Sequence, residues 1–179
     1  MANKTWFITG TSRGFGREWT IAALDRGDRV AATARDTGTL KDLVSKYGDR
    51  LLALALDVQD RSACFAAVDQ AQKQFGRLDI VINNAGYGQF GLIEELSEKE
   101  LRDQLETNVF GAFWVTQAVL PILRAQGSGH IVNVSTSLVD YPDSTVPSAL
   151  ASLTKGGLAA VTPSLAMGGP GFEPGTVGL

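Results

Sequence analysis

Cysteine and histidine are almost absent from this chain, whose 179 residues include one of each, Cys64 and His130. A single thiol cannot form a disulfide within the chain, so we expect a reducing compartment, with Cys64 buried rather than reactive. His130 has neither metal-ligand partners nor triad partners nearby in the sequence, and we interpret it as structural. The sequence therefore predicts no metal site.

Long apolar runs and an excess of positive charge are also missing. No segment approaches the roughly eighteen apolar residues of a membrane-spanning helix, and the apolar run near the N-terminus is too short for a signal peptide. The formal net charge is -3, without a cluster of basic residues, which argues against nucleic acid and anionic membranes as partners. We expect a cytoplasmic protein that binds neither.

Internal repeats and interdomain linkers are absent too, and the length suits a single domain. The last stretch differs from the rest, because residues 168–179 include five glycines and two prolines and show hardly any hydrophobic pattern. Such a composition is typical of disorder. We therefore predict a folded domain over residues 1–166 and a disordered tail over residues 167–179.

What the sequence does contain is an alternation of short apolar runs with longer segments of helical period. The short runs predict strands at 5–9, 29–34, 51–56, 79–83 and 130–134. Helices are expected in the gaps, at 40–47, after the capping pair Ser97 and Glu100, at 106–123 and at 148–166. This alternation is typical of a doubly wound parallel sheet. The predicted fold class is α/β, a Rossmann-like arrangement of three α/β/α layers.

A glycine-rich turn, TGTSRGFG, joins the first predicted strand to the first predicted helix. Gly10 would permit the tight turn, Gly14 would let main-chain amides approach a pyrophosphate, and Gly16 would allow close helix packing. The spacing is G-x3-G-x-G rather than the general G-x-G-x-x-G, and an ordinary loop is the alternative. Its place after the first strand favours phosphate binding. The residues predicted to bind a cofactor here are Gly10, Ser12, Arg13, Gly14, Phe15 and Gly16.

Three motifs in order make the chain resemble the short-chain dehydrogenase/reductase family over residues 4–160: TGTSRGFG, NNAG at 83–86, and Asn108 within TNVFG. The resemblance implies hydride transfer between a nicotinamide dinucleotide and a small-molecule carbonyl or alcohol. The NNAG segment would then back the cofactor; the alternative is a turn that uses Asn and Gly for their tolerance of left-handed conformations. The cofactor-binding residues that the resemblance adds are Asp57, Val58, Asn84, Ala85 and Gly86.

Two arginines bear on the choice between NAD(H) and NADP(H). Asp36 stands about twenty residues after the glycine turn, where a carboxylate could bind the ribose 2'-hydroxyl of NAD. Arg35 directly follows the second strand and Arg13 lies in the glycine turn, two places where a guanidinium could hold the 2'-phosphate of NADP. By the resemblance, Ala34 occupies the acidic position that selects NAD. We expect NADP(H) rather than NAD(H); the alternative is that both arginines are solvated surface charges.

The resemblance also implies a catalytic group made of an asparagine, a serine, a tyrosine and a lysine. Asn108 matches the asparagine, Thr136 stands at the serine position, and Lys155 matches the lysine that binds the nicotinamide ribose and lowers the pKa of the tyrosine. The Y-x3-K spacing then places Ala151 where the tyrosine should stand. The usual proton donor is therefore absent, and Tyr141 in the preceding loop is the alternative donor.

Family members continue through two further strands and a substrate-covering segment that this sequence does not contain. We therefore expect a sheet that is incomplete at its C-terminal edge, with the strand at 130–134 unpaired on one side. The apolar surface left exposed predicts self-association through the long helices. Three hypotheses follow: an NADP-dependent oxidoreductase with an impaired proton donor, a non-catalytic NADP-binding module, and a truncated product without stable function.

Overall fold

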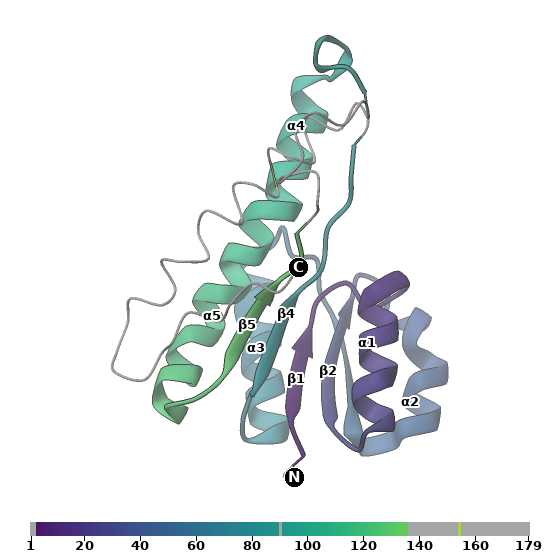
Figure 1. The fold of residues 1–179 in the computed structure, drawn as a ribbon, viewed down its shortest axis with the longest axis vertical. Coiled ribbons are helices and arrows are strands. Elements are labelled where there is room, and N and C mark those ends of the chain that lie inside the picture. The colour runs from purple at the N-terminus through teal and green to yellow at the C-terminus, as the bar shows by residue number, and fades with distance from the viewer. Residues whose placement is uncertain (1–2, 90, 136–153, 155–179) are drawn as a thin grey trace.

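The computed structural model describes residues 3–89, 91–135 and 154. In this part of the chain five parallel strands form one sheet in the order β3-β2-β1-β4-β5 (Figure 1). Each predicted strand is present, and its ends differ from the prediction by at most one residue. The strands are β1 (Thr5–Ile8), β2 (Arg29–Ala34), β3 (Leu51–Ala55), β4 (Ile80–Asn83) and β5 (His130–Asn133).

Helices connect these strands and cover both faces of the sheet. The α-helices are α1 (Gly14–Asp25), α2 (Lys41–Tyr47), α3 (Arg61–Phe75), α4 (Glu98–Leu105) and α5 (Gly111–Gln126). Shorter helical pieces are the 3-10 turns η1 (Thr37–Leu40), η2 (Gly48–Arg50) and η3 (Ile93–Glu95), and the π-helical turn η4 (Glu106–Phe110). The predicted capping box is confirmed, since Ser97 and Glu100 bind each other's main-chain N–H at the start of α4.

Two hydrophobic cores, one on each face of the sheet, hold the three layers together. Helices α1 and α2 pack on one face, over a core that includes Ile8, Leu24 and Leu40. Helices α3 and α5 pack on the other face, over a core that includes Phe7 and Val115. Five of the six residues of β2 are buried because both faces of this strand are covered. The predicted Rossmann-like three-layer fold is confirmed.

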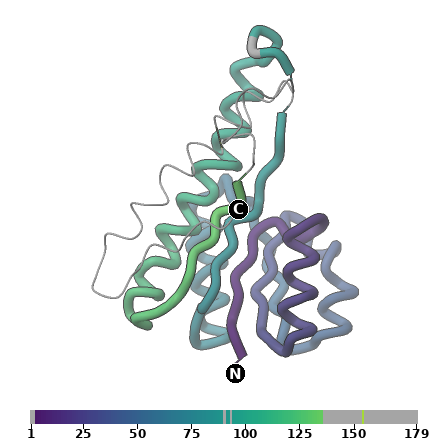
Figure 2. The backbone as a smooth tube through the Cα atoms, viewed as in Figure 1, coloured from purple at the N-terminus to yellow at the C-terminus, as the bar shows by residue number. Residues whose placement is uncertain are grey.

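The order of the strands determines where a ligand can bind. After β1 the chain builds β2 and β3 on one side and then crosses to place β4 on the other side of β1 (Figure 2). The loops that follow β1 and β4 therefore diverge at the carboxyl ends of the strands. A crevice forms at such a switch point in open α/β sheets, and it is where ligands bind.

Strand β5 pairs with β4 and forms one edge of the sheet among the described residues. The expected long helix at 106–123 begins as the π-helical turn η4 and continues as α5, and η4 also joins it to α4. The helix predicted at 148–166 and the tail predicted at 167–179 lie outside the described residues. In the described ranges, no helix combines the length and the apolar character that crossing a membrane requires.

Asp28, just before β2, anchors the amino end of β1. Its carboxylate is only 6 % exposed and accepts hydrogen bonds from the main-chain N–H of Lys4 and from Trp6 Nε1, both at 2.9 Å. Arg26 adds an ion pair at 2.6 Å. A buried carboxylate with several donors is stabilising only while all its partners remain, so β1 is tied to the turn that begins β2.

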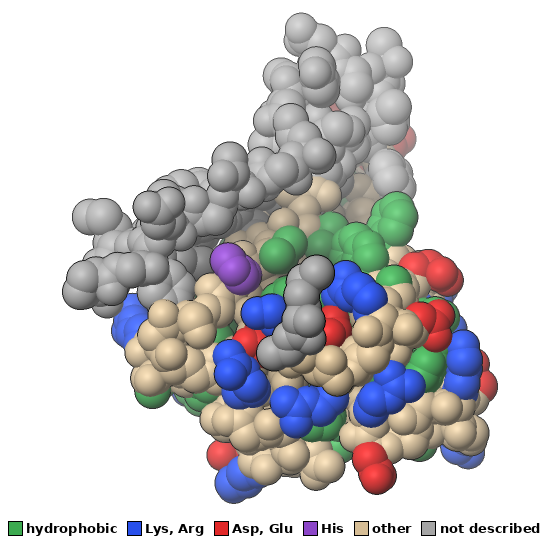
Figure 3. Space-filling model, turned by 60° about the horizontal axis from the view of Figure 1, so that its bottom comes forward, with side chains coloured by type: hydrophobic (Ala, Val, Ile, Leu, Met, Phe, Trp, Pro, Cys, Tyr) green, Lys and Arg blue, Asp and Glu red, His purple; other side chains and the backbone are tan. Residues whose placement is uncertain are grey.

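Asp79 makes the corresponding contact on the other side of β1. Its Oδ2 atom accepts a hydrogen bond from the main-chain N–H of Thr5 at 2.8 Å, and its Oδ1 atom pairs with Arg77. Figure 3 shows this end of the molecule, where basic side chains are interspersed with acidic ones rather than gathered into a patch of one sign. Asp28 and Asp79 thus hold the amino end of β1 between its two neighbouring strands.

Cys64 lies on α3 inside the core and is fully buried. Burial raises the pKa of its thiol to about 12, and the nearby carboxylates of Asp60 and Asp57 act in the same direction. We predict that the native protein does not react with a thiol reagent such as dithionitrobenzoate at pH 8, because almost no thiolate is present or accessible. One thiol per chain should react once the protein is unfolded in guanidinium; rapid reaction of the native protein would contradict the burial.

Candidate functional site

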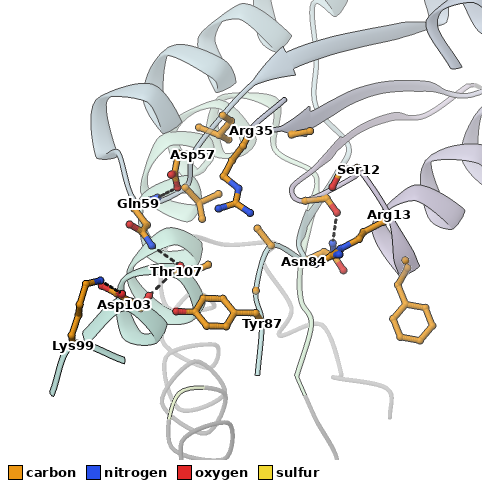
Figure 4. A pocket seen from close by; sticks show the side chains of 18 residues that line it. Ser12, Arg13, Arg35, Asp57, Gln59, Asn84, Tyr87, Lys99, Asp103 and Thr107 are labelled. Atoms are coloured by element: carbon orange, nitrogen blue, oxygen red, sulfur yellow. Dashed lines mark hydrogen bonds and ion pairs between the residues drawn. The ribbon is translucent and has the colours of Figure 1, made fainter. Parts of the chain in front are cut away.

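A cleft of about 830 Å³ lies at the carboxyl ends of β1 to β4 (Figure 4). Its walls are the loop between β1 and α1, the ends of β2 and β3, the loop after β4, and one side of α4 and η4. The predicted cofactor residues that line it are Gly10, Ser12, Arg13, Gly14, Phe15, Arg35, Asp57, Val58, Asn84, Ala85 and Gly86. The topology thus gathers five separate segments of the sequence around one cavity, and four of them contain the predicted residues.

Gly16 lies behind this surface, where the loops after β1 and β4 approach each other closely. A Cβ atom on Gly16 would lie 2.5 Å from the carbonyl oxygen of Gly10 and 2.5 Å from Nδ2 of Asn84. Gly10 itself has φ +70°, and a Cβ there would lie 2.9 Å from Cα of Ala85. Neither position has room for a side chain, so the first turn of α1 comes into direct contact with the loop after β4.

Hydrogen bonds lock this contact. The Thr9 hydroxyl accepts from the main-chain N–H groups of Asn84 and Ala85, both at 2.9 Å. The Asn84 side chain donates in return to the carbonyl oxygens of Thr9 and Gly10, at 2.8 and 3.0 Å. The two loops therefore form one rigid floor to the cleft. The Asn84 side chain thus binds the protein itself, although the residue also lines the cleft.

The amino end of α1 points at the cleft and is suited to an anion. Arg13, the residue before the helix, makes no side-chain capping hydrogen bond, and among the described residues of the first turn no side chain is acidic. The first N–H groups of a helix lack intrahelical partners and carry a partial positive charge. A phosphate group would supply the missing acceptors, so this end of α1 fits the pyrophosphate of a dinucleotide.

Arg13 and Arg35 come from different loops and meet the same cavity. Figure 4 shows the Arg35 guanidinium directed into the cleft, with Arg13 on the loop after β1. Both side chains are exposed, and neither takes part in an ion pair within the described part of the chain. Asp36 does not line the cleft, because its carboxylate caps η1 by accepting from the N–H of Gly38 at 2.8 Å. Arg13 and Arg35 therefore bring two unpaired positive charges to the cleft within the described part of the chain.

The end of β3 forms the wall beside Arg35. Asp57 accepts a hydrogen bond from the N–H of Gln59 at 3.1 Å, which shapes the loop, and Val58 packs against Gly111 at the start of α5. The Gln59 side chain donates to the hydroxyl of Thr107 at 2.8 Å. This wall is thus attached to the π-helical turn η4 rather than standing free.

The facing wall contains residues that sequence reasoning missed. Tyr87 directly follows NNAG and lines the cleft with Lys99 and Asp103 from α4, which form an ion pair at 2.5 Å. Burial raises the pKa of the Tyr87 hydroxyl, and the charge of Asp103 raises it further. A phenol whose pKa is raised is a poor proton donor at neutral pH. The adjacency of Tyr87 to NNAG was the one signal that could have indicated it.

Asn108 lies on η4 but does not line the cleft. It is fully buried, and its side chain binds the main chain of Tyr87, donating to the carbonyl oxygen at 2.8 Å and accepting from the N–H at 3.0 Å. It also donates to the Thr154 hydroxyl at 3.1 Å. Its contacts are therefore with the protein. Thr136, Ala151 and Lys155, predicted for the same group, lie outside the described residues, as does Tyr141.

A parallel sheet whose first strand leads through a close glycine turn into a helix, with a cleft at the switch point, defines a Rossmann-like nucleotide-binding fold. The family model of the short chain dehydrogenases matches residues 4–169. The chain belongs to that family, as the resemblance predicted.

Individual relatives agree with this assignment. Oxidoreductase BOA17 of Botryotinia fuckeliana is 48% identical over 134 residues, which are 74% of this chain and 49% of that protein. A short-chain dehydrogenase of Streptomyces avermitilis superposes with a TM-score of 0.86 at 41% identity, covering 92% of this chain and 59% of the other. A 3-ketoacyl-(acyl-carrier-protein) reductase of Brucella melitensis, solved with NADH, gives a TM-score of 0.85 at 30% identity, covering 92% and 69%. The chain spans about half the length of the curated relatives it matches.

Proposed function

We propose that the protein is an NADP-dependent oxidoreductase of the short-chain type that acts on a small-molecule carbonyl or alcohol. The observation that carries the proposal is the cleft itself. The amino end of α1 has no side-chain cap and suits a pyrophosphate, and it shares the cleft with two exposed arginines that have no ion-pair partner among the described residues. When bound, the nicotinamide would accept or supply the hydride. The chain's own part is to hold and orient the cofactor.

Several residues would divide this task. The glycine turn and the end of α1 would bind the pyrophosphate, Asp57 and Val58 would contact the adenosine, and Asn84 to Gly86 would back the cofactor. Arg13 and Arg35 would bind the 2'-phosphate, for which paired guanidinium donors are well suited. The capping role of Asp36 leaves its carboxylate engaged with Gly38, which supports NADP over NAD.

The test is a titration of the purified chain with NADPH and with NADH, followed by nucleotide fluorescence and by the melting temperature. A ligand that binds the folded state alone raises the melting temperature. NADPH should bind in the micromolar range and NADH more weakly. If neither dinucleotide binds at millimolar concentration, the proposed function is wrong; if NADH binds as well as NADPH, the cofactor assignment is wrong.

The choice of cofactor can be tested at Arg35. We predict that Arg35→Asp weakens NADPH binding by about tenfold to hundredfold, the loss expected from one charge-assisted contact with a phosphate and its replacement by a repelling charge. NADH affinity should change by much less, because NADH lacks the 2'-phosphate. Arg124→Asp, the same change at an exposed site on α5, is the control and should leave both affinities unchanged. Equal weakening of NADPH and NADH by Arg35→Asp would contradict the prediction.

A non-catalytic NADP-binding module is the second candidate, and Ala151 favours it. This residue stands where the resemblance places the proton-donating tyrosine, and the one described tyrosine that lines the cleft, Tyr87, has a raised pKa. The two candidates differ in turnover. Oxidation of NADPH with any member of a panel of aldehydes and ketones supports the enzyme, whereas saturable binding without oxidation supports the module.

Self-association and location are the remaining parts of the proposal. Phe110 on η4 and Phe113 on α5 are 41 % and 37 % exposed; Phe110 stacks on the Trp114 ring, and Phe113 meets that ring edge-on. Phe65 on the neighbouring α3 is also exposed. We propose that this aromatic surface supports a homo-oligomer, which sedimentation of the purified chain would reveal. We also propose that the protein is cytoplasmic and has no nucleic acid partner.

A further inference from the structure

We infer that Gln104 is a positioning residue for the cleft, acting with Asn108 to fix the loop that carries Tyr87. The inference rests on the proposed function, since the cleft matters only if it binds a dinucleotide. Gln104 lies on α4 one turn before Asn108, and both side chains are fully buried. Neither residue lines the cleft.

The Gln104 side chain uses both ends of its amide on main-chain groups of one loop. Its Nε2 atom donates to the carbonyl oxygen of Tyr87 at 3.1 Å, and its Oε1 atom accepts from the N–H of Gln89 at 3.2 Å. Nε2 also lies 3.4 Å from the hydroxyl of Thr154. Main-chain groups in a loop lack the regular partners that they would have in a strand or a helix. The buried Gln104 amide supplies partners for two of these groups.

Gln104 and Asn108 therefore share their acceptors. Both donate to the carbonyl oxygen of Tyr87 and both donate to Thr154, while each accepts from a different N–H of the loop. We call these two side chains the amide pair. The pair binds the main chain of residues 87 and 89 on the side away from the cleft. It therefore fixes the position from which the Tyr87 side chain extends to the cleft.

The amide pair touches one wall of the cleft and not the other. Arg35 follows β2, and Asp57 and Val58 follow β3, and among the described residues neither Gln104 nor Asn108 forms a hydrogen bond with these three residues. Adenosine 2',5'-bisphosphate contains the groups that this second wall would recognise. The rest of NADPH must extend along the wall formed by Asn84 to Tyr87. Loosening the amide pair should thus weaken binding of the whole dinucleotide without weakening binding of the fragment.

The test is Gln104→Met, which keeps the length and volume of the side chain and removes its hydrogen bonds. We expect the dissociation constant of NADPH to rise about tenfold, the effect of losing hydrogen bonds that order a binding loop. The dissociation constant of adenosine 2',5'-bisphosphate should stay within about twofold. Gln72→Met, on α3 and away from the cleft, is the matched control and should change neither constant.

A second measurement does not depend on any cofactor. Hydrogen exchange of the Tyr87 and Gln89 amides in the free protein should become faster in Gln104→Met, while exchange in β1 and β4 stays unchanged. Unchanged exchange at residues 87 and 89 would overturn the inference even if no dinucleotide binds. Equal losses of NADPH and fragment affinity, or no loss of either, would overturn it while leaving the proposed function intact. Failure of the unaltered protein to bind NADPH would overturn the proposed function instead.

Discussion

Gly16→Ala should lower the affinity for NADPH by about tenfold to hundredfold and the free energy of unfolding by about 1–3 kcal/mol. The added methyl group would lie 2.5 Å from both the Gly10 carbonyl oxygen and Asn84 Nδ2. Main-chain oxygen cannot yield as the end of a flexible side chain can, so α1 or the loop after β4 must shift. Either shift changes the floor of the cleft. Fluorescence titration with NADPH and urea denaturation would measure the two effects.

The control for this prediction is Gly27→Ala, in the turn between α1 and β2. Gly27 has φ +94°, and a Cβ there would meet no atom within 4 Å. That variant should lose about 1 kcal/mol of stability through backbone strain and bind NADPH normally. If Gly16→Ala bound NADPH as tightly as the unaltered chain, close contact between the two loops would not be required for the site.

Asp28→Asn is expected to lower the free energy of unfolding by about 2–4 kcal/mol at pH 7. The substitution keeps an acceptor for Lys4 but places an amide hydrogen towards Trp6 or Arg26, which leaves a buried donor without a partner. Because Arg26 is largely exposed, water screens its share of the loss, and most of the loss comes from Trp6 Nε1, which no longer has an acceptor. Urea denaturation would measure it. Asp69→Asn, in an exposed ion pair with Lys73, should have little effect.

The loss caused by Asp28→Asn should depend on pH. Burial would raise the pKa of Asp28, but hydrogen bonds from Arg26, Lys4 and Trp6 together lower it below 3.8. A carboxyl whose pKa is lower in the folded state stabilises the protein above its unfolded pKa, and this stabilisation is lost as the pH falls through the folded pKa. The difference between the two proteins should therefore be largest above about pH 5 and should shrink below about pH 4. A difference independent of pH would contradict this account.

The sheet could be predicted from the sequence because parallel strands covered on both faces must be short apolar runs. β2 is the clearest case, since its run of small and β-branched residues is buried almost throughout. Gly10 was predicted to permit the tight turn and Gly16 to allow close helix packing, and the distances to Ala85 and Asn84 give the physical reason why neither position has room for a side chain. The roles of the cleft residues in binding a cofactor stay predictions.

Other parts of the site could not be predicted. The helix expected at 106–123 showed no sign of a π-helical turn, because a π turn differs from an α turn in one hydrogen-bond step rather than in hydrophobic period. Gln104 gave no signal either, since a glutamine on an amphipathic helix is ordinarily solvated. Its burial follows from the path of the loop after β4, which depends on contacts between distant segments.

The π-helical turn η4 also bears on how sequences of this kind can vary. Two adjacent side chains leave it in different directions, Thr107 towards Gln59 and Asn108 towards Tyr87. Deleting one residue there would rotate α4 by about 100° relative to α5, and both attachments could not then be kept. The distance between the wall that contains Gln59 and the wall that contains Tyr87 therefore depends on the helical register of α4 relative to α5. Substitutions in the loops would leave this register as it is, whereas a deletion in η4 would change the distance between Gln59 and Tyr87.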